Sequence, residues 1–158
     1  MMQKISTIFL QTITLLIGVG IFIFMIIEPI FEGRNIGSTL FEIYFKDLFL
    51  AYAYIGSVPF FIALYQIFKV LGYIKTDNVF VFSQKSMRAL QIIRYGVLTT
   101  SGFIFAAVAY LFIVRPGDDI AGGVAMGLAL IFISLVIATS TSVFEKILQN
   151  GMDKKSKD

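Results

Sequence analysis

Four long apolar windows without a charged residue dominate the hydrophobic pattern of this chain. They comprise residues 5–27, 48–68, 95–114 and 120–144, and a charged residue stands at each border. A charge at the centre of a bilayer helix costs about 2.5 to 3.5 kcal/mol in insertion assays, so uncharged windows of this length indicate membrane spans. About 20 helical residues cross a hydrocarbon core of about 30 Å. The pattern therefore predicts an all-α polytopic membrane protein, a four-transmembrane-helix antiparallel bundle with spans at about 5–27, 48–68, 95–114 and 122–144.

Three alternative structures agree less well with the sequence. Barrel strands would alternate apolar and polar residues, whereas residues 20–27 are apolar on every side. Helices of a soluble bundle would need a polar face, which the four windows lack. A cleaved signal peptide would explain Lys4 before the first window, but 23 apolar residues without a small-residue cleavage site argue against cleavage.

Basic residues predict the orientation of the spans. With the amino terminus inside, ten lysines and arginines fall in the inner segments and three in the outer segments, and in short loops such a bias sets orientation. Both termini are therefore expected to be cytoplasmic. The inner residues are Lys4, Lys69, Lys75, Lys85, Arg88, Arg94, Lys146, Lys154, Lys155 and Lys157, and the outer ones are Arg34, Lys46 and Arg115.

Composition supports a membrane class and removes several kinds of chemistry. Of the 158 residues, 58% are hydrophobic and 15% charged, which is outside soluble usage. The net charge of +3 follows from orientation, so no nucleic-acid partner is needed to explain it. The chain has no cysteine and no histidine, so we expect no enzyme, no cofactor and no metal site. Residues 1–150 are expected to form one transmembrane domain and residues 151–158 a polar cytoplasmic tail.

Both long loops contain helix signals. Thr39-Leu-Phe-Glu42 has the form of a capping box, so the second span should begin early, with an aromatic segment at 39–48 that serves as an interfacial belt or as a binding surface. On the inner side, Ser83 resembles an N-cap. The third span should then have a basic amphipathic prefix, which either contacts phosphates or simply begins in the headgroups. The basic residues of this inner loop are Lys75, Lys85, Arg88 and Arg94.

The inner loop also resembles a known family. The sequence from Phe82 to Ile93 is similar to a pattern of the bacterial domain-of-unknown-function family numbered 2975, and Phe82, Ser83, Arg88, Leu90 and Ile93 match it. Ser86 departs from it, because asparagine is more usual there. The resemblance covers the four-span layout and implies a small bacterial inner-membrane protein, often encoded near a small helix-turn-helix regulator. It implies no known activity.

Within the windows, polar side chains are few. No ionisable residue other than tyrosine occurs there, which counts against a proton-coupled pump. Glu28, beside Pro29, is the nearest acidic residue to the first span. Gln11, Gln66 and residues 99–101 either line a polar path or hydrogen-bond neighbouring helices.

Small residues at Gly18, Gly102, Gly123 and Gly127 are candidates for helix packing, because glycine lets two helix backbones approach closely. They indicate seams of the bundle or, alternatively, a dimer interface. We expect an accessory or regulatory component of the cell membrane that contacts the lipid bilayer and a membrane-protein partner or a second copy. A small transporter or channel-like subunit and a lipid-binding protein are the alternatives.

Overall fold

The computed structural model describes residues 2–31, 35, 37–46, 48–76, 84–114 and 120–155. Its elements are α1 (Met2–Phe31), α2 (Leu40–Lys46), α3 (Leu48–Thr76), α4 (Gln84–Val114) and α5 (Ala121–Lys155). Four of them are long and apolar enough to cross a membrane, with candidate spans Ile5–Phe31, Leu48–Gly72, Gln84–Val114 and Ala121–Asp153. The predictions of an all-α fold and of four apolar spans are confirmed for the described residues.

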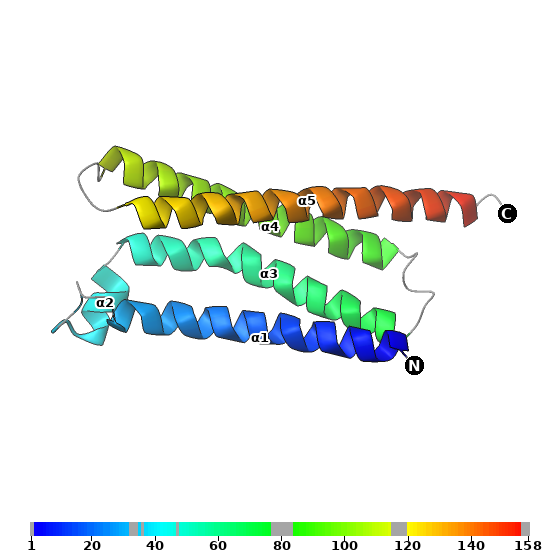
Figure 1. Cartoon of the computed structure of the whole chain (residues 1–158), viewed down its shortest axis with the longest axis horizontal. Helices are drawn as coiled ribbons and strands as arrows, with labels where there is room; N and C mark the ends of the chain where they lie inside the picture. The colour runs from blue at the N-terminus through cyan, green and yellow to red at the C-terminus, as the bar shows by residue number, and fades with distance from the viewer. Residues whose placement is uncertain are drawn as a thin grey trace.

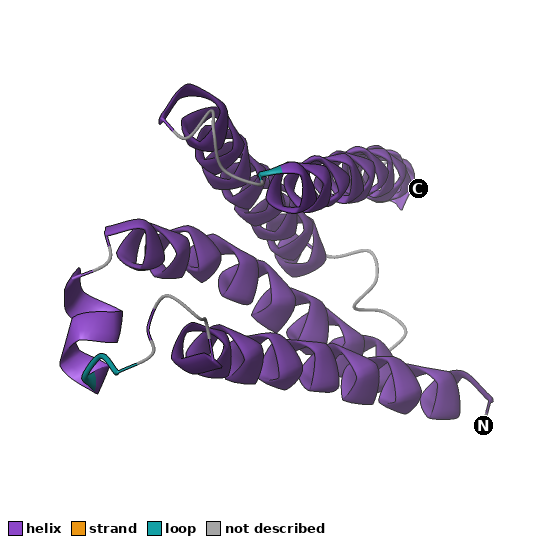
Figure 2. Cartoon of the chain, turned by 60° about the vertical axis from the view of Figure 1, so that its left-hand side comes forward, coloured by secondary structure: helices purple, strands orange, loops and turns teal. Residues whose placement is uncertain are grey.

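The long helices pack in the order α1, α3, α4, α5 (Figure 1). Helices α4 and α5 form the most extensive interface, α3 packs on α4, and α1 packs on α3. Among the described residues, α1 and α5 share no interface of comparable extent. Figure 2 shows the result, in which α1 and α3 form one pair and α4 and α5 another, joined where α3 meets α4. The four helices therefore form an open row.

The start of α1 and the end of α5 lie at the same end of the molecule, called here the terminal end (Figure 1). The first turn of α1, the last turns of α3 and α5 and the first turn of α4 all lie there. Helix α2 lies at the opposite end, across the ends of α1 and α3 (Figure 2).

The buried positions of α5 show how a helix that is apolar all round selects its packing face. Val124, Gly127, Ala138, Thr141, Glu145 and Leu148 are buried, with spacings that fit a seven-residue repeat. Most of these side chains are small or polar, whereas large residues such as Phe132 are exposed. Small and polar seams with apolar exteriors are typical of helices that associate in lipid.

The joint between α3 and α4 is the core of the row. Ala63, Ile93 and Val97 form a buried cluster with Ile67 and Leu90 packed against it. Gly96 makes the crossing close, because a Cβ there would lie 2.8 Å from the carbonyl oxygen of Pro59 and 3.0 Å from Ala63. A larger residue would hold the two helix pairs apart.

The helix signals in the two long loops agree with the structure in part. The capping box is present: Thr39 N–H donates to Glu42 Oε2 at 3.1 Å, and Glu42 N–H donates to Thr39 Oγ1 at 3.3 Å. It starts the short separate helix α2, however, and not a continuous extension of α3. Helix α4 begins at Gln84, directly after Ser83, which lies outside the described residues. The apolar face of its prefix packs within the protein, since Ala89 and Ile93 are buried.

Candidate functional site

A polar cluster joins α4 and α5 near the terminal end, and it consists of Arg94, Tyr95, Ser142 and Glu145. Arg94 Nη1 donates to Glu145 Oε2 at 2.9 Å and contacts Ser142 Oγ at 3.4 Å. Arg94 Nη2 donates to the Tyr95 hydroxyl at 3.2 Å, and the guanidinium carbon lies 4.9 Å from the centre of the Tyr95 ring. The guanidinium group is thus held by an ion pair, two hydroxyls and an aromatic face.

The acidic partner is the more buried member of the pair. The side chain of Glu145 is 10% exposed and that of Arg94 24%. Glu145 Oε1 is buried and has no hydrogen-bond partner among the described residues. Removing a carboxylate from water is costly unless a cation compensates it, so Glu145 depends on Arg94. The pair therefore links the first turns of α4 to α5.

The structure places the residues of the predicted basic loop in different settings. Lys85 and Arg88 are exposed on the first turns of α4. Arg94, six residues after Arg88, is bound to Glu145. Lys75 lies near the end of α3, where its side chain is outside the described part. On α4, the exposed cations that a partner could contact are consequently Lys85 and Arg88.

The four glycines predicted to pack helices differ in how closely they approach a neighbouring helix. A Cβ on Gly18 of α1 would lie 2.7 Å from Leu64 of α3, and one on Gly127 of α5 would lie 2.5 Å from Val108 of α4. A Cβ on Gly123 would lie 3.6 Å from Leu111, an ordinary contact in the same α4–α5 seam. At Gly102 an added Cβ would meet nothing within 4 Å.

Pro29 organises the α2 end of the molecule. Proline has no N–H, so the carbonyl oxygen of Met25, four residues earlier, loses its helical donor. The Tyr54 hydroxyl of α3 donates to that oxygen at 2.8 Å. Beside it the Tyr44 hydroxyl donates to Ile26 O, and Asn35 Nδ2 donates to Pro29 O at 2.7 Å. Side chains from α2, α3 and the loop thereby satisfy the carbonyl groups at the end of α1.

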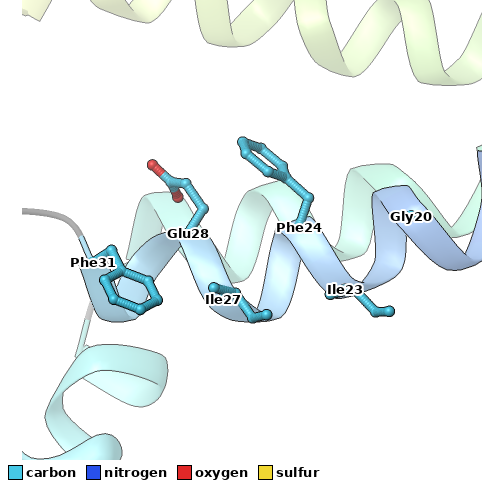
Figure 3. A pocket seen from close by; sticks show the side chains of 6 residues that line it. All are labelled: Gly20, Ile23, Phe24, Ile27, Glu28 and Phe31. Carbon is cyan, nitrogen blue, oxygen red and sulfur yellow. The ribbon is translucent and has the colours of Figure 1, made fainter.

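Next to Pro29, Glu28 borders a cavity of about 490 Å³ on α1. The described residues that line it are Gly20, Ile23, Phe24, Ile27, Glu28 and Phe31 (Figure 3). Glu28 and Phe24, one turn apart, project to the same side of the helix. Glu28 and Phe24 place a carboxylate beside a phenyl ring, a combination that suits an organic cation.

Two of these contacts, the Arg94–Glu145 pair and the hydrogen bond from Tyr54 to Met25, were not predicted from the sequence. Glu145 marks the border of the fourth window and was assigned to the inner segment, although it continues the repeat of Ala138 and Thr141 with spacings of three and four residues. That spacing is the signal that would have placed it on the seam. No signal of this kind connects Tyr54 with Met25, because the two residues are 29 positions apart.

The fold and the polar seams define a multi-pass membrane protein with four apolar spanning helices. A family model described as "Protein of unknown function (DUF2975)" matches residues 9–157, and the chain belongs to this family, as the pattern around Phe82 and Arg88 indicated. It is also similar to an uncharacterized membrane protein, YoaS, of Bacillus subtilis (strain 168). The identity is 38% over 159 residues, which cover 99% of this chain and 98% of YoaS. No solved structure matches the chain.

Proposed function

We propose that this chain is an accessory or regulatory component of the bacterial inner membrane that acts through protein contacts and catalyses no reaction. Its contact surface is the part of α4 and α5 beyond the hydrophobic windows, residues 84–94 and 145–155, called here the terminal hairpin. Both termini are cytoplasmic in this proposal, and the four long helices are antiparallel. The ten-to-three distribution of basic residues supports the cytoplasmic orientation. The position of the first turn of α1 and the last turn of α5 at one end of the molecule supports termini on the same side (Figure 1).

The observation that carries the proposal is the length of the terminal hairpin. Helix α4 begins eleven residues before the window that starts at Tyr95, and α5 continues eleven residues past Phe144. Eleven residues correspond to about 16 Å of helix, whereas the headgroup layer is about 5 to 8 Å thick on each side. The hairpin therefore projects beyond the membrane surface.

Packing keeps the terminal hairpin rigid. Ser86 and Ala89 of α4 and Leu148 of α5 are buried, and the pair between Arg94 and Glu145 lies at its base. A rigid surface loses little conformational entropy when it binds a partner. Its exposed cations, Lys85 and Arg88, suit a partner with an acidic surface.

The proposal is tested by affinity capture of the full-length protein from its native membrane in mild detergent. We expect a partner in stoichiometric amount. It should be lost from the double variant Lys85→Glu/Arg88→Glu, since like charges across an interface repel. A matched control, Phe45→Ala on α2, alters an exposed side chain at the other end and should retain the partner. Absence of a stoichiometric protein, or its retention by the charge-reversed variant, would refute the proposal.

The orientation needs its own measurement, because the charge reversal removes two of the residues that set it. The chain has no cysteine, so single cysteines report their side of the membrane without background labelling. Cysteines at Gly33 and Gly117 should react with a membrane-impermeant reagent in intact cells. Cysteines at Ser83 and Ser156 should not react. Labelling of the Ser83 position from outside would contradict cytoplasmic termini.

Transport of a lipophilic cation is a second candidate, and the cavity beside Glu28 is the observation that favours it. A transporter of this kind would confer resistance to a toxic quaternary ammonium compound. Resistance would disappear in Glu28→Gln, which keeps the size of the side chain and removes its charge. If expression of the native chain confers no such resistance, this candidate is excluded for that class of substrate.

A further inference from the structure

An apolar groove lies between the middle of α1 and the part of α3 that leads toward the terminal end. It has a volume of about 420 Å³ and is almost free of polar surface. Its lining extends from Thr14 to Phe22 on α1 and from Phe61 to Phe68 on α3. These stretches correspond to about 12 Å along α1 and about 10 Å along α3. The groove is thus an elongated trough and not a compact pocket.

Two close contacts between the helices fix the shape of this groove. Near the middle of the spans, Gly18 lets α1 approach Leu64. Toward the terminal end, the side-chain amide of Gln11 donates to Phe68 O at 3.2 Å. Between these points the buried Thr14 turns its hydroxyl to Leu10 O of its own helix, at 2.8 Å, so it presents no unsatisfied donor to the groove. One contact therefore lies at the middle of the groove and the other at its Phe68 end, and together they set the spacing of α1 and α3 along it.

We propose that this groove binds one acyl chain of an anionic phospholipid, with the lipid phosphate at Lys69. The groove lies within two candidate membrane spans, so the molecules that reach it are lipids, and its apolar walls offer nothing to a polar ligand. This site is independent of the terminal hairpin, so either proposal can fail without the other.

Charge complementarity identifies the headgroup. Lys69 is exposed and follows Tyr65 by four residues, so it lies on the same face of α3 one helical turn nearer the terminal end. An acyl chain in the groove would therefore emerge beside an ammonium group at the depth of the headgroups. A basic residue near the membrane surface favours anionic over zwitterionic lipid.

The test uses tryptophan as a reporter, because the chain contains none. Tyr65→Trp places the reporter in the groove, and Phe144→Trp on α5 is a matched control. The native side chains are 61% and 59% exposed, and both are aromatic. The full-length variants in detergent are titrated with phosphatidylglycerol whose acyl chains are brominated, since bromine quenches a tryptophan that it touches.

Quenching of the groove reporter should saturate near one lipid per protein. Quenching of the control should rise only gradually, as expected for lipid that exchanges freely around the protein. Equal curves for the two reporters would overturn the proposal, since they would show that the groove holds lipid no more firmly than the surface of α5.

Two further changes separate the acyl chain from the headgroup. Val19→Phe fills the groove, and displacing about two methylene groups should weaken binding about tenfold. Ile17→Phe is its control on the same helix, because the two native side chains are 47% and 46% exposed and Ile17 does not line the groove. Equal affinities for these two variants would also overturn the proposal.

The headgroup is tested with Lys69→Gln, which should weaken the binding of brominated phosphatidylglycerol about fivefold. It should leave brominated phosphatidylcholine unaffected. Lys85→Gln removes an exposed lysine of α4 and should change neither lipid. An unchanged preference for phosphatidylglycerol in Lys69→Gln would refute the assignment of the phosphate.

Discussion

The hydrogen bond from Tyr54 to Met25 should be strong only because Pro29 follows in α1. In the native chain the Met25 carbonyl has no helical donor, and Tyr54 donates to it at 2.8 Å. In Pro29→Ala the new N–H of residue 29 can donate to that carbonyl. The effect of removing the tyrosine hydroxyl should therefore depend on which residue stands at position 29.

The magnitude follows from the cost of an unpaired carbonyl. Interhelical hydrogen bonds in membranes contribute about 0.6 kcal/mol on average and about 1.7 at most, and an unsatisfied buried acceptor costs about 1 to 3 kcal/mol. We expect Tyr54→Phe to lower the free energy of unfolding by about 1.5 kcal/mol in the native background. In the Pro29→Ala background the loss should be about 0.5 kcal/mol or less.

The assay is a double-mutant cycle with equilibrium unfolding in mixed micelles, which cancels the packing change caused by Pro29→Ala itself. Tyr52→Phe is the matched control. Its hydroxyl donates to Phe103 O at 2.7 Å, and that carbonyl has no proline four residues later. Its cost should be the same in both backgrounds. Equal costs of Tyr54→Phe in the two backgrounds would refute the reasoning.

Two further predictions concern the ion pair and the packing glycines. Arg94→Leu leaves Glu145 buried without a cation and should lower the free energy of unfolding by about 2 to 3 kcal/mol, less than for a fully buried pair. Arg94→Leu/Glu145→Leu should recover most of that loss in the same unfolding assay, and a greater loss in the double variant would contradict it. Gly96→Ala should cost about 1 to 3 kcal/mol, because the new Cβ would lie 2.8 Å from the backbone carbonyl oxygen of Pro59 and would force α3 and α4 apart. Gly102→Ala, which meets nothing, should stabilise α4 by about 0.5 to 1 kcal/mol, and similar effects of the two changes would disprove the close contact.

The sequence by itself determined the number and place of the spanning helices. A charge within the bilayer costs several times the thermal energy, so the chain must separate its charges with apolar windows long enough to cross, and these are visible without a structure. The capping box at Thr39 and Glu42 was also predictable, because both of its partners lie within one helical turn.

Only the tertiary structure decided which faces meet. Lipid tails are as apolar as leucine, so a spanning helix need not turn its most hydrophobic face to its neighbours, and hydrophobicity does not reveal the seam. The structure alone placed Glu145 against Arg94 and Tyr54 against Met25, since those partners are 51 and 29 residues apart. The structure also showed that the long helices pack in an open row, because the order of packing depends on close approaches such as that at Gly96 and not on the windows.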